Sequence, residues 1–230
     1  NRAEAYQKGD RNDAMFSQIG DDNRAYTEQK GDDNLAETYQ HGYDNRGWIE
    51  QVGMENDAFI NQVPGYMPTG NLADINQYGD YNWAQADQFN SYNKAFITQK
   101  GDANWALSQQ AGDYNRTEIY QKGMDNYSYA RVVHGDNNRI FSTQIGDYNI
   151  SAVHLLAGSD DNKVDIDQKG TSNMVGDAPY YGSGYFGGLD NYGVLIDGDL
   201  NKSTVYQNGT SNMAEVNVIG NSNTSVITQQ

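Results

Sequence analysis

The chain contains no cysteine, only three prolines among its 230 residues, and few cations. The absence of cysteine excludes a disulfide framework and thiolate metal sites. Fifteen Lys and Arg against 31 Asp and Glu give a net charge of −16, which argues against a nucleic-acid partner, since such partners need a basic surface. No apolar run approaches the roughly 20 residues of a membrane span, so membrane insertion is not expected. No signal peptide is visible, and the first residue already opens a repeat unit, which indicates a processed chain.

Apolar residues are also scarce, at 37% of the chain with a mean hydropathy of −0.86. This composition excludes a thick apolar core and, together with the charge, is typical of disordered chains. Against disorder stand the low proline content and the fixed positions at which Tyr, Ile and Val recur. The sequence therefore predicts an ordered protein with a thin core.

What the chain does have is a repeat of eleven residues, Asn-x-Ala-x-x-x-Gln-x-Gly-x-x. Twenty such units can be counted, the first beginning at Asn1 and the last at Asn223. Gln occupies the seventh place in fifteen of them, and the rule fails mainly between Asn126 and Asn201. A repeat this regular predicts a stacked architecture in which equivalent residues lie above one another.

Within a unit the pattern favours a strand over a helix, because the apolar places alternate and each unit contains a glycine and β-branched residues. Places one, three, five and seven then share an inner face, and the charged residues and most aromatic residues lie on the outer face. Gly and Asp or Asn at places nine to eleven suit the positive φ of a tight corner.

Amides on an inner face are costly unless they are paired. Units stacked in register place identical amides roughly 4.8 Å apart, where they bond to one another in a ladder along the stacking axis. We therefore expect the repeated amides to set the register of the strands. The predicted ladder residues are Gln7, Gln18, Gln29, Gln40, Gln51, Gln62, Gln77, Gln88, Gln99, Gln110, Gln121, Gln144, Gln168, Gln207 and Gln229, with Asn1, Asn12, Asn23 and Asn34 at the first place.

Two units form one strand-turn-strand rung of about 22 residues, so the expected fold is all-β. It is a two-sheet, parallel, in-register and amyloid-like β-solenoid of about ten rungs, formed as one domain over residues 1–230. Odd units stack in one sheet and even units in the other. The insertions follow even units, so the inserted loops, including 63–70 and 176–190, are expected at corners on one edge.

The two outer faces differ in chemistry. Twelve of the fifteen Lys and Arg fall on odd units in two rows with acids between them, whereas the even face has only Arg131 and Lys202. Exposed apolar area on the even face predicts a contact surface, through which assembled chains associate laterally or grip surfaces. Alternatively, the stacked rings stabilise only their own sheet. The apolar even-face residues are Trp83, Trp105, Tyr127, Phe59, Phe89, Leu107 and Tyr129.

Catalytic and cofactor motifs are absent from the sequence. His41, His134 and His154 fall in different rungs without a fixed partner, and no nucleophile elbow, phosphate loop or zinc-protease motif occurs. The segment that begins at Asp197 lacks the Gly and Glu of a calcium loop. Rows of corner Asp residues leave divalent-cation binding open beside plain solvation. We predict no enzyme, cofactor or metal site.

The repeat resembles that of the curlins, the subunits of curli, a functional amyloid of Gram-negative biofilms. The segments "QKGDRNDAMFSQIG" and "QKGDANWALSQQAG" carry the resemblance, which covers nearly the whole chain. It implies secretion as an unfolded chain, and assembly into adhesive, pilus-like extracellular fibres on the cell surface. Curli-type secretion and nucleation proteins are implied as partners.

The first and last units are both regular, so no capping unit is expected at either end. An even number of units predicts a head-to-tail homopolymer in which Gln229 meets Gln18 and Ile227 meets Phe16 of the next copy. The alternative function is a capped solenoid that acts as an adhesin or as an ice-binding or ligand-binding repeat protein.

Overall fold

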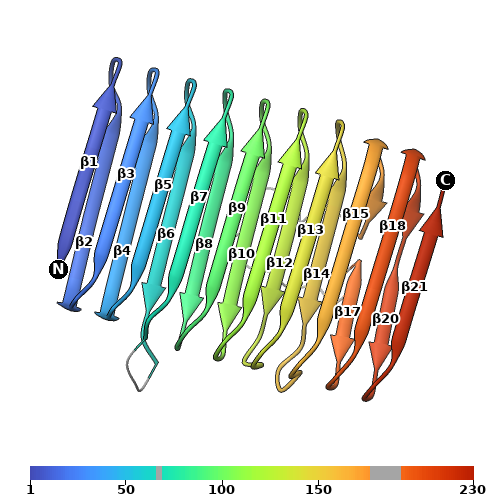
Figure 1. Cartoon of the computed structure of the whole chain (residues 1–230). Helices are drawn as coiled ribbons and strands as arrows, with labels where there is room; N and C mark the ends of the chain where they lie inside the picture. Colours follow the sequence, from blue (N-terminus) through green and yellow to red (C-terminus); the bar gives the residue numbers. More distant parts are fainter. Residues whose placement is uncertain (66–68, 177–192) are drawn as a thin grey trace, which may run out of the picture.

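The computed structural model describes residues 1–65, 69–176 and 193–230, and all regular secondary structure in these ranges is β-strand. Two parallel sheets lie face to face and form a solenoid of about ten turns, which confirms the predicted fold class. Figure 1 shows the sheets as two layers, with the N-terminus at one end of the stack and the C-terminus at the other.

The ten-stranded sheet is formed by strands from alternate units. In spatial order its strands are β1 (Arg2–Lys8), β3 (Arg24–Lys30), β5 (Arg46–Val52), β7 (Leu72–Tyr78), β9 (Lys94–Lys100), β11 (Arg116–Lys122), β13 (Arg139–Ile145), β15 (Lys163–Thr171), β18 (Lys202–Thr210) and β21 (Thr224–Gln229).

The eleven-stranded sheet lies behind it in Figure 1. Its strands are β2 (Asp13–Asp21), β4 (Leu35–Tyr43), β6 (Asp57–Val63), β8 (Trp83–Phe89), β10 (Trp105–Ala111), β12 (Tyr127–Val132), β14 (Ile150–Leu155), β16 (Met174–Val175), β17 (Val194–Asp197), β19 (Met213–Ala214) and β20 (Val216–Ile219).

The strands are in register, so each residue pairs with the residue at the same place of the unit two steps away. Gln7 pairs with Gln29, for example, and Trp83 with Trp105. Burial alternates along the interior strands of the ten-stranded sheet, as it does along β7, where Ala73, Ile75 and Gln77 are buried and their neighbours are not. Isoleucine and alanine rows from the two sheets fill the space between them, which makes the core thin, as the composition predicts.

The number of units predicted from the sequence is wrong by one. Met174–Val175 pairs with the first part of β14 and Val194–Ile196 with its last part, so β16 and β17 are two pieces of one half-turn. The unit predicted to begin at Asn191, which lies outside the described residues, is therefore not a separate half-turn. From β18 onward the assignment of units to sheets is reversed, and β18 and β21 belong to the ten-stranded sheet.

Three insertions lie at the same edge of the solenoid, where the chain passes from the eleven-stranded sheet to the ten-stranded sheet. They are the described part of the loop at 63–70, at the lower edge of Figure 1, and the connections at 133–138 and 156–162. Most of the predicted loop at 176–190 lies outside the described residues. Its flanking strands are the two pieces of one half-turn, so the prediction of a corner at this position is wrong.

Candidate functional site: amide rows and sheet edges

An unbroken row of glutamine amides runs through all ten strands of the ten-stranded sheet. Each Nε2 donates to the Oε1 of the next glutamine toward the C-terminus, at distances of 2.7–3.0 Å. The row consists of Gln7, Gln29, Gln51, Gln77, Gln99, Gln121, Gln144, Gln168, Gln207 and Gln229.

The corresponding row in the eleven-stranded sheet is shorter. It runs through Gln18, Gln40, Gln62, Gln88 and Gln110, and Gln110 donates to the hydroxyl of Thr117 at 3.1 Å. The next strands carry Val132 and Leu155 at this place, and both are buried in the core. Apolar packing thus replaces the amide row in this part of the sheet.

The repeat pattern does not predict that the second amide proton of the glutamines after Gln7 links the two sheets. Gln99 Nε2 donates to the main-chain oxygen of Trp83 at 2.9 Å, and Gln121 Nε2 donates to that of Trp105 at the same distance. The glutamines therefore fix the register along the stack and hold the sheets together across the core.

Asparagines at the first place form further rows at the corners. Asn45 Nδ2 donates to Asn23 Oδ1 at 2.9 Å and Asn34 Nδ2 donates to Asn12 Oδ1 at the same distance. Asn1 accepts the main-chain N–H of Asn23 at 3.1 Å. These contacts satisfy polar groups where each strand leaves its corner.

The structure corrects the predicted junction between chains. Gln229 lies beside Gln207 and Ile227 beside Val205 in the ten-stranded sheet, whereas Gln18 and Phe16 lie in the other sheet. The predicted pairing is wrong because it depends on an even number of units. The residue at the opposite edge of Gln229's own sheet is Gln7, and the whole of β1 is exposed at that edge.

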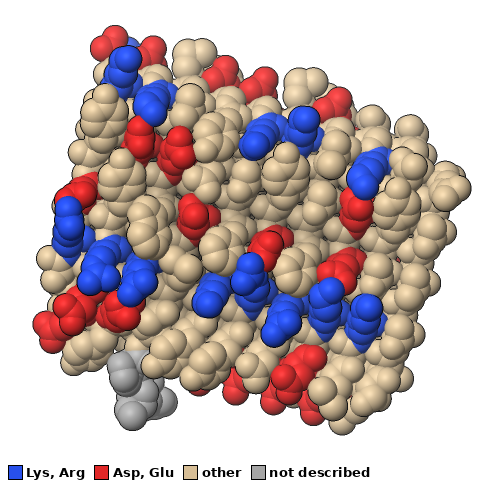
Figure 2. Space-filling view, in the orientation of Figure 1, with Lys and Arg blue, Asp and Glu red and all other residues tan. Residues whose placement is uncertain are grey.

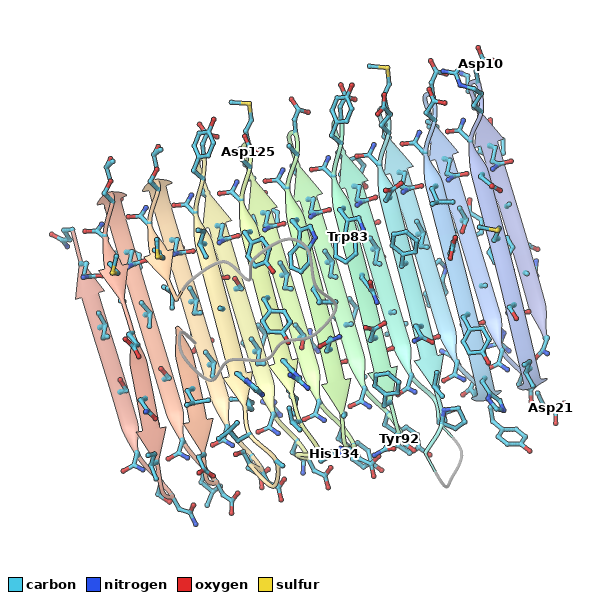
Figure 3. All side chains as sticks on the ribbon, turned by 180° about the vertical axis from the view of Figure 1, so that it is seen from behind. Asp10, Asp21, Trp83, Tyr92, Asp125 and His134 are labelled. Carbon is cyan, nitrogen blue, oxygen red and sulfur yellow. The ribbon has the colours of Figure 1, made fainter. Side chains whose placement is uncertain are left out.

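The aspartates of the corners accept backbone hydrogen bonds. Asp32 Oδ1 accepts the N–H of Asp10 at 2.8 Å, and Asp136 Oδ1 accepts that of Asp113 at 2.7 Å on the opposite edge. Figure 3 shows Asp10 and Asp125 at one edge, and Asp21, Tyr92 and His134 at the other. Within the described residues no group of three or more His, Cys, Asp or Glu could hold a metal ion.

The outer face of the ten-stranded sheet carries nearly all the cations. Figure 2 shows two rows of Lys and Arg on this face, with acidic side chains between them. Lys202 pairs with Lys163 in this sheet and not in the even face, where the miscounted unit had placed it. Only Arg11 and Arg131 lie outside the sheet, so the two faces differ even more than predicted.

The outer face of the eleven-stranded sheet is less open than predicted. Leu107, Tyr127 and Tyr129 are buried and form a cluster against which Trp83 and Trp105 pack, so their predicted exposure is wrong. The rings stack along the solenoid axis, with centroids 4.7 Å apart for Trp83 and Trp105 and 4.2 Å apart for Trp105 and Tyr127. Trp83 lies in the middle of this face in Figure 3. These distances favour the alternative in which the rings stabilise their own sheet.

The features of the described residues that could serve a function are the amide rows and the strand edges. The three histidines lie on different segments, His41 in β4, His134 after β12 and His154 in β14. His154 is buried in β14, where desolvation and the neighbouring Arg131 lower the pKa of its imidazole to about 4. No helix in the described part of the chain could span a membrane.

Comparison with known families agrees with this geometry. A family model described as "Curlin associated repeat" matches residues 1–31, 31–63, 69–101 and 93–123, which together make up just over half of the chain. The matched residues include all the strands of the eleven-stranded sheet that carry its glutamine row, from Gln18 to Gln110, and the strands of the ten-stranded sheet beside them. No curated protein matches the chain.

Proposed function

Because the chain belongs to the curlin-repeat family, we propose that it is the structural subunit of an extracellular functional amyloid fibre. The family supports a curli-type subunit that assembles with copies of itself, and a structural role rather than an enzymatic one. The finer assignment, to a biofilm fibre on the surface of a Gram-negative cell, is our proposal.

One observation carries the proposal, namely the open ends of the long glutamine row. Gln7 Nε2 donates inward to Gln29, which leaves its Oε1 facing outward at the β1 edge. Gln229 accepts from Gln207 and uses one amide proton on the main-chain oxygen of Met213, which leaves the other proton for a further acceptor. Edge strands with unpaired main-chain groups are templates for another chain. We propose that β21 of one copy pairs with β1 of the next, with Gln229 donating to Gln7. The eleven-stranded sheet ends one half-turn earlier, so the proposed contact involves the ten-stranded sheet alone.

The test is fibre elongation from seeds, followed by electron microscopy of the purified chain after hours at rest. An unpaired amide at a buried junction costs roughly 1–3 kcal/mol, so we expect Gln7→Ala or Gln229→Ala to slow elongation by about tenfold. Gln18→Ala is the matched control, because Gln18 lies at the same edge in the other sheet. Equal slowing by Gln18→Ala and Gln7→Ala, or chains that stay single, would contradict this junction.

We also propose that the chain is secreted and displayed at the cell surface with the help of curli-type secretion and nucleation proteins. The support is family membership. Immunogold labelling of producing cells, with and without the secretion channel, is the appropriate measurement. Fibres that remain inside the cells when the channel is present would overturn this part of the proposal.

A further inference from the structure

Ion pairs on the outer face of the ten-stranded sheet follow a rule within single strands. Where the fourth place of an eleven-residue unit carries an acid, a cation at the second place of the same unit pairs with it. Examples are Arg116 with Glu118 at 2.5 Å and Lys163 with Asp165 at 2.8 Å. Asp74 in β7 is the exception, because Leu72 stands where the cation would be. The interruption is visible in the lower row of cations in Figure 2.

A second carboxylate on the neighbouring strand lacks its cation in the same way. Glu28 pairs with Lys30 at 2.5 Å, since lysine stands two places after the acid. In β5 that place is taken by Val52, and Glu50 instead accepts a hydrogen bond from the hydroxyl of Tyr78 at 2.9 Å. Asp74 and Glu50 thus lie on adjacent strands, and neither forms the ion pair within its own strand that the repeat provides elsewhere.

Both carboxylates line one groove of about 420 Å³ with aromatic walls. Trp48 and Phe96 are the strand neighbours of Asp74 on its two sides, each roughly one strand spacing, 4.8 Å, away. Tyr26 follows beyond Trp48. Asn76 donates to Asp74 Oδ1 at 2.9 Å, and partial burial raises the pKa of the Asp74 carboxyl. The groove therefore holds negative charge between aromatic rings.

Aromatic rings on this face already hold cations elsewhere in the same molecule. The guanidinium of Arg116 lies 5.2 Å from the centre of the Phe96 ring, and the ammonium of Lys163 lies 5.5 Å from that of Phe141. Within the described residues no such contact is made by Trp48, whose side chain is 38% exposed.

The cations around the groove have other partners. Lys30 pairs with Glu28, which also lines the groove, and from there it attracts Glu50, while Arg116 lies over the Phe96 ring. Arg46 and Lys94 occupy the second place of the strands on either side of β7. Arg46 pairs with Asp44 at 3.3 Å, and in the part of the chain that the structure describes neither cation forms an ion pair with Asp74 or Glu50. A cation from solution would supply the missing charge.

We propose that this groove binds an alkylated ammonium cation, with the charged group between Trp48 and Phe96 and against Asp74 and Glu50. A quaternary ammonium is weakly hydrated and is attracted to aromatic faces, most strongly to tryptophan. The two carboxylates exclude anions and add a long-range attraction for cations. This site does not depend on fibre formation.

The experiment titrates the folded chain with choline and follows the choline methyl signal by ligand-observed NMR. We expect saturable binding that is weakened about fivefold or more by Asp74→Asn or Glu50→Gln, because each change removes one charge roughly 5 Å from the ligand. Trp48→Leu should weaken binding about tenfold through loss of the cation–π contact. Asp165→Asn is the matched control, since Asp165 pairs with Lys163 away from the groove and its loss should leave binding unchanged.

The neutral carbon analogue of choline, 3,3-dimethylbutan-1-ol, separates charge recognition from simple apolar binding. We expect no saturable binding of this alcohol. Equal binding of the alcohol and choline, or equal effects of Asp165→Asn and Asp74→Asn, would overturn the proposal. Circular dichroism of each variant establishes that the solenoid is intact before binding is compared.

Discussion

At the scale of single residues, the corner glycines are the least replaceable positions. Gly101 has φ of +109°, and a Cβ placed there would lie 2.2 Å from the main-chain oxygen of Gly123 on the next turn. No side chain fits that distance, so the glycine is required both by its own backbone and by the close approach of its neighbour.

We expect Gly101→Ala to lower the free energy of unfolding by about 2–4 kcal/mol, since a backbone shift must be added to conformational strain. Gly158→Ala is the control, because Gly158 also has a positive φ, of +78°, but nothing lies within 4 Å of its Cβ position. That variant should cost only about 1 kcal/mol. Chemical denaturation measures both, and equal losses would contradict the role assigned to the close approach.

His154 gives the solenoid a pH dependence. Its pKa in the folded chain is about 4, below the ordinary value of 6.5, so the unfolded chain binds the proton more readily. The contribution of His154 to stability is therefore lost as the pH falls from about 6.5 to 4, and reaches about 3 kcal/mol in total. Raised carboxyl pKa values, such as that of Asp87, act in the opposite sense over acid pH.

The measurement is therefore the difference between the wild type and His154→Gln at each pH, with unfolding followed from pH 7 to pH 4. We expect the wild type to lose stability relative to the variant as the pH falls. Parallel curves would show that the imidazole titrates normally in the folded chain.

Prediction from the sequence succeeded for hydrogen bonds between residues that occupy the same place in successive turns. Gln77 bonds to Gln99 because in-register stacking places like beside like, and the interval in the sequence contains that information. The bond from Gln99 to the main chain of Trp83 joins different places of different units. It depends on how the two sheets are offset across the core, which the repeat does not encode.

At the scale of strands, the main departure from prediction is the half-turn formed by β16 and β17. Asn191 and Gly198 match the Asn and Gly of the repeat motif closely enough to be counted as a separate unit. Counting the motif therefore predicts one strand too many. The sequence showed that this unit differs in two ways, by the step of ten residues from Asn191 to Asn201, against the usual eleven, and by Asp197 in place of Gln. Pairing with β14 settles the assignment, because the two strands occupy different parts of one neighbour.

The stacked rings of β8, β10 and β12 support their own sheet. Replacing both Trp83 and Trp105 by Thr removes the stacking between them and their contact with Tyr127. We expect the free energy of unfolding to fall by about 2–5 kcal/mol, from lost stacking and lost burial. Tyr92→Thr with Tyr114→Thr is a control stack of exposed corner rings, with centroids 5.0 Å apart, and should cost much less. Similar losses for both pairs would contradict a special role for the tryptophans.

Lateral association of fibres through the eleven-stranded sheet stays a prediction, and the same variant tests it. If the tryptophans form the contact between fibres, bundles of the Thr variant disperse while single fibres remain. Dispersal of wild-type bundles by salt alone would assign the contact to the charged face.

At the scale of the whole molecule, the row of amides in the ten-stranded sheet gives the stack a direction. Every Nε2 from Gln7 to Gln207 donates toward the C-terminal edge, so one edge presents an acceptor and the other a donor. The asparagine rows run the opposite way, with Asn45 donating to Asn23. Two like edges brought together would place oxygen against oxygen or N–H against N–H. Rotating the terminal amide by 180° would remove this mismatch, but it would break the hydrogen bond between that amide and the next glutamine inside the stack.

A fibre built from such units has a head and a tail, which need not grow at the same rate. We expect labelled subunits added to unlabelled seeds to extend the two tips by different lengths, as seen by two-colour fluorescence microscopy. Equal extension at both tips would argue that the amide direction is not transmitted to growth.

In the proposed fibre, directionality also governs repair. When a fibre breaks, each fragment carries one head and one tail, and only unlike tips present complementary amides. Fragments that meet at random therefore rejoin in about half of their tip-to-tip encounters, and the rejoined fibre keeps a single orientation along its length. A material held together in this way can be sheared into pieces and restored without ever containing a reversed segment.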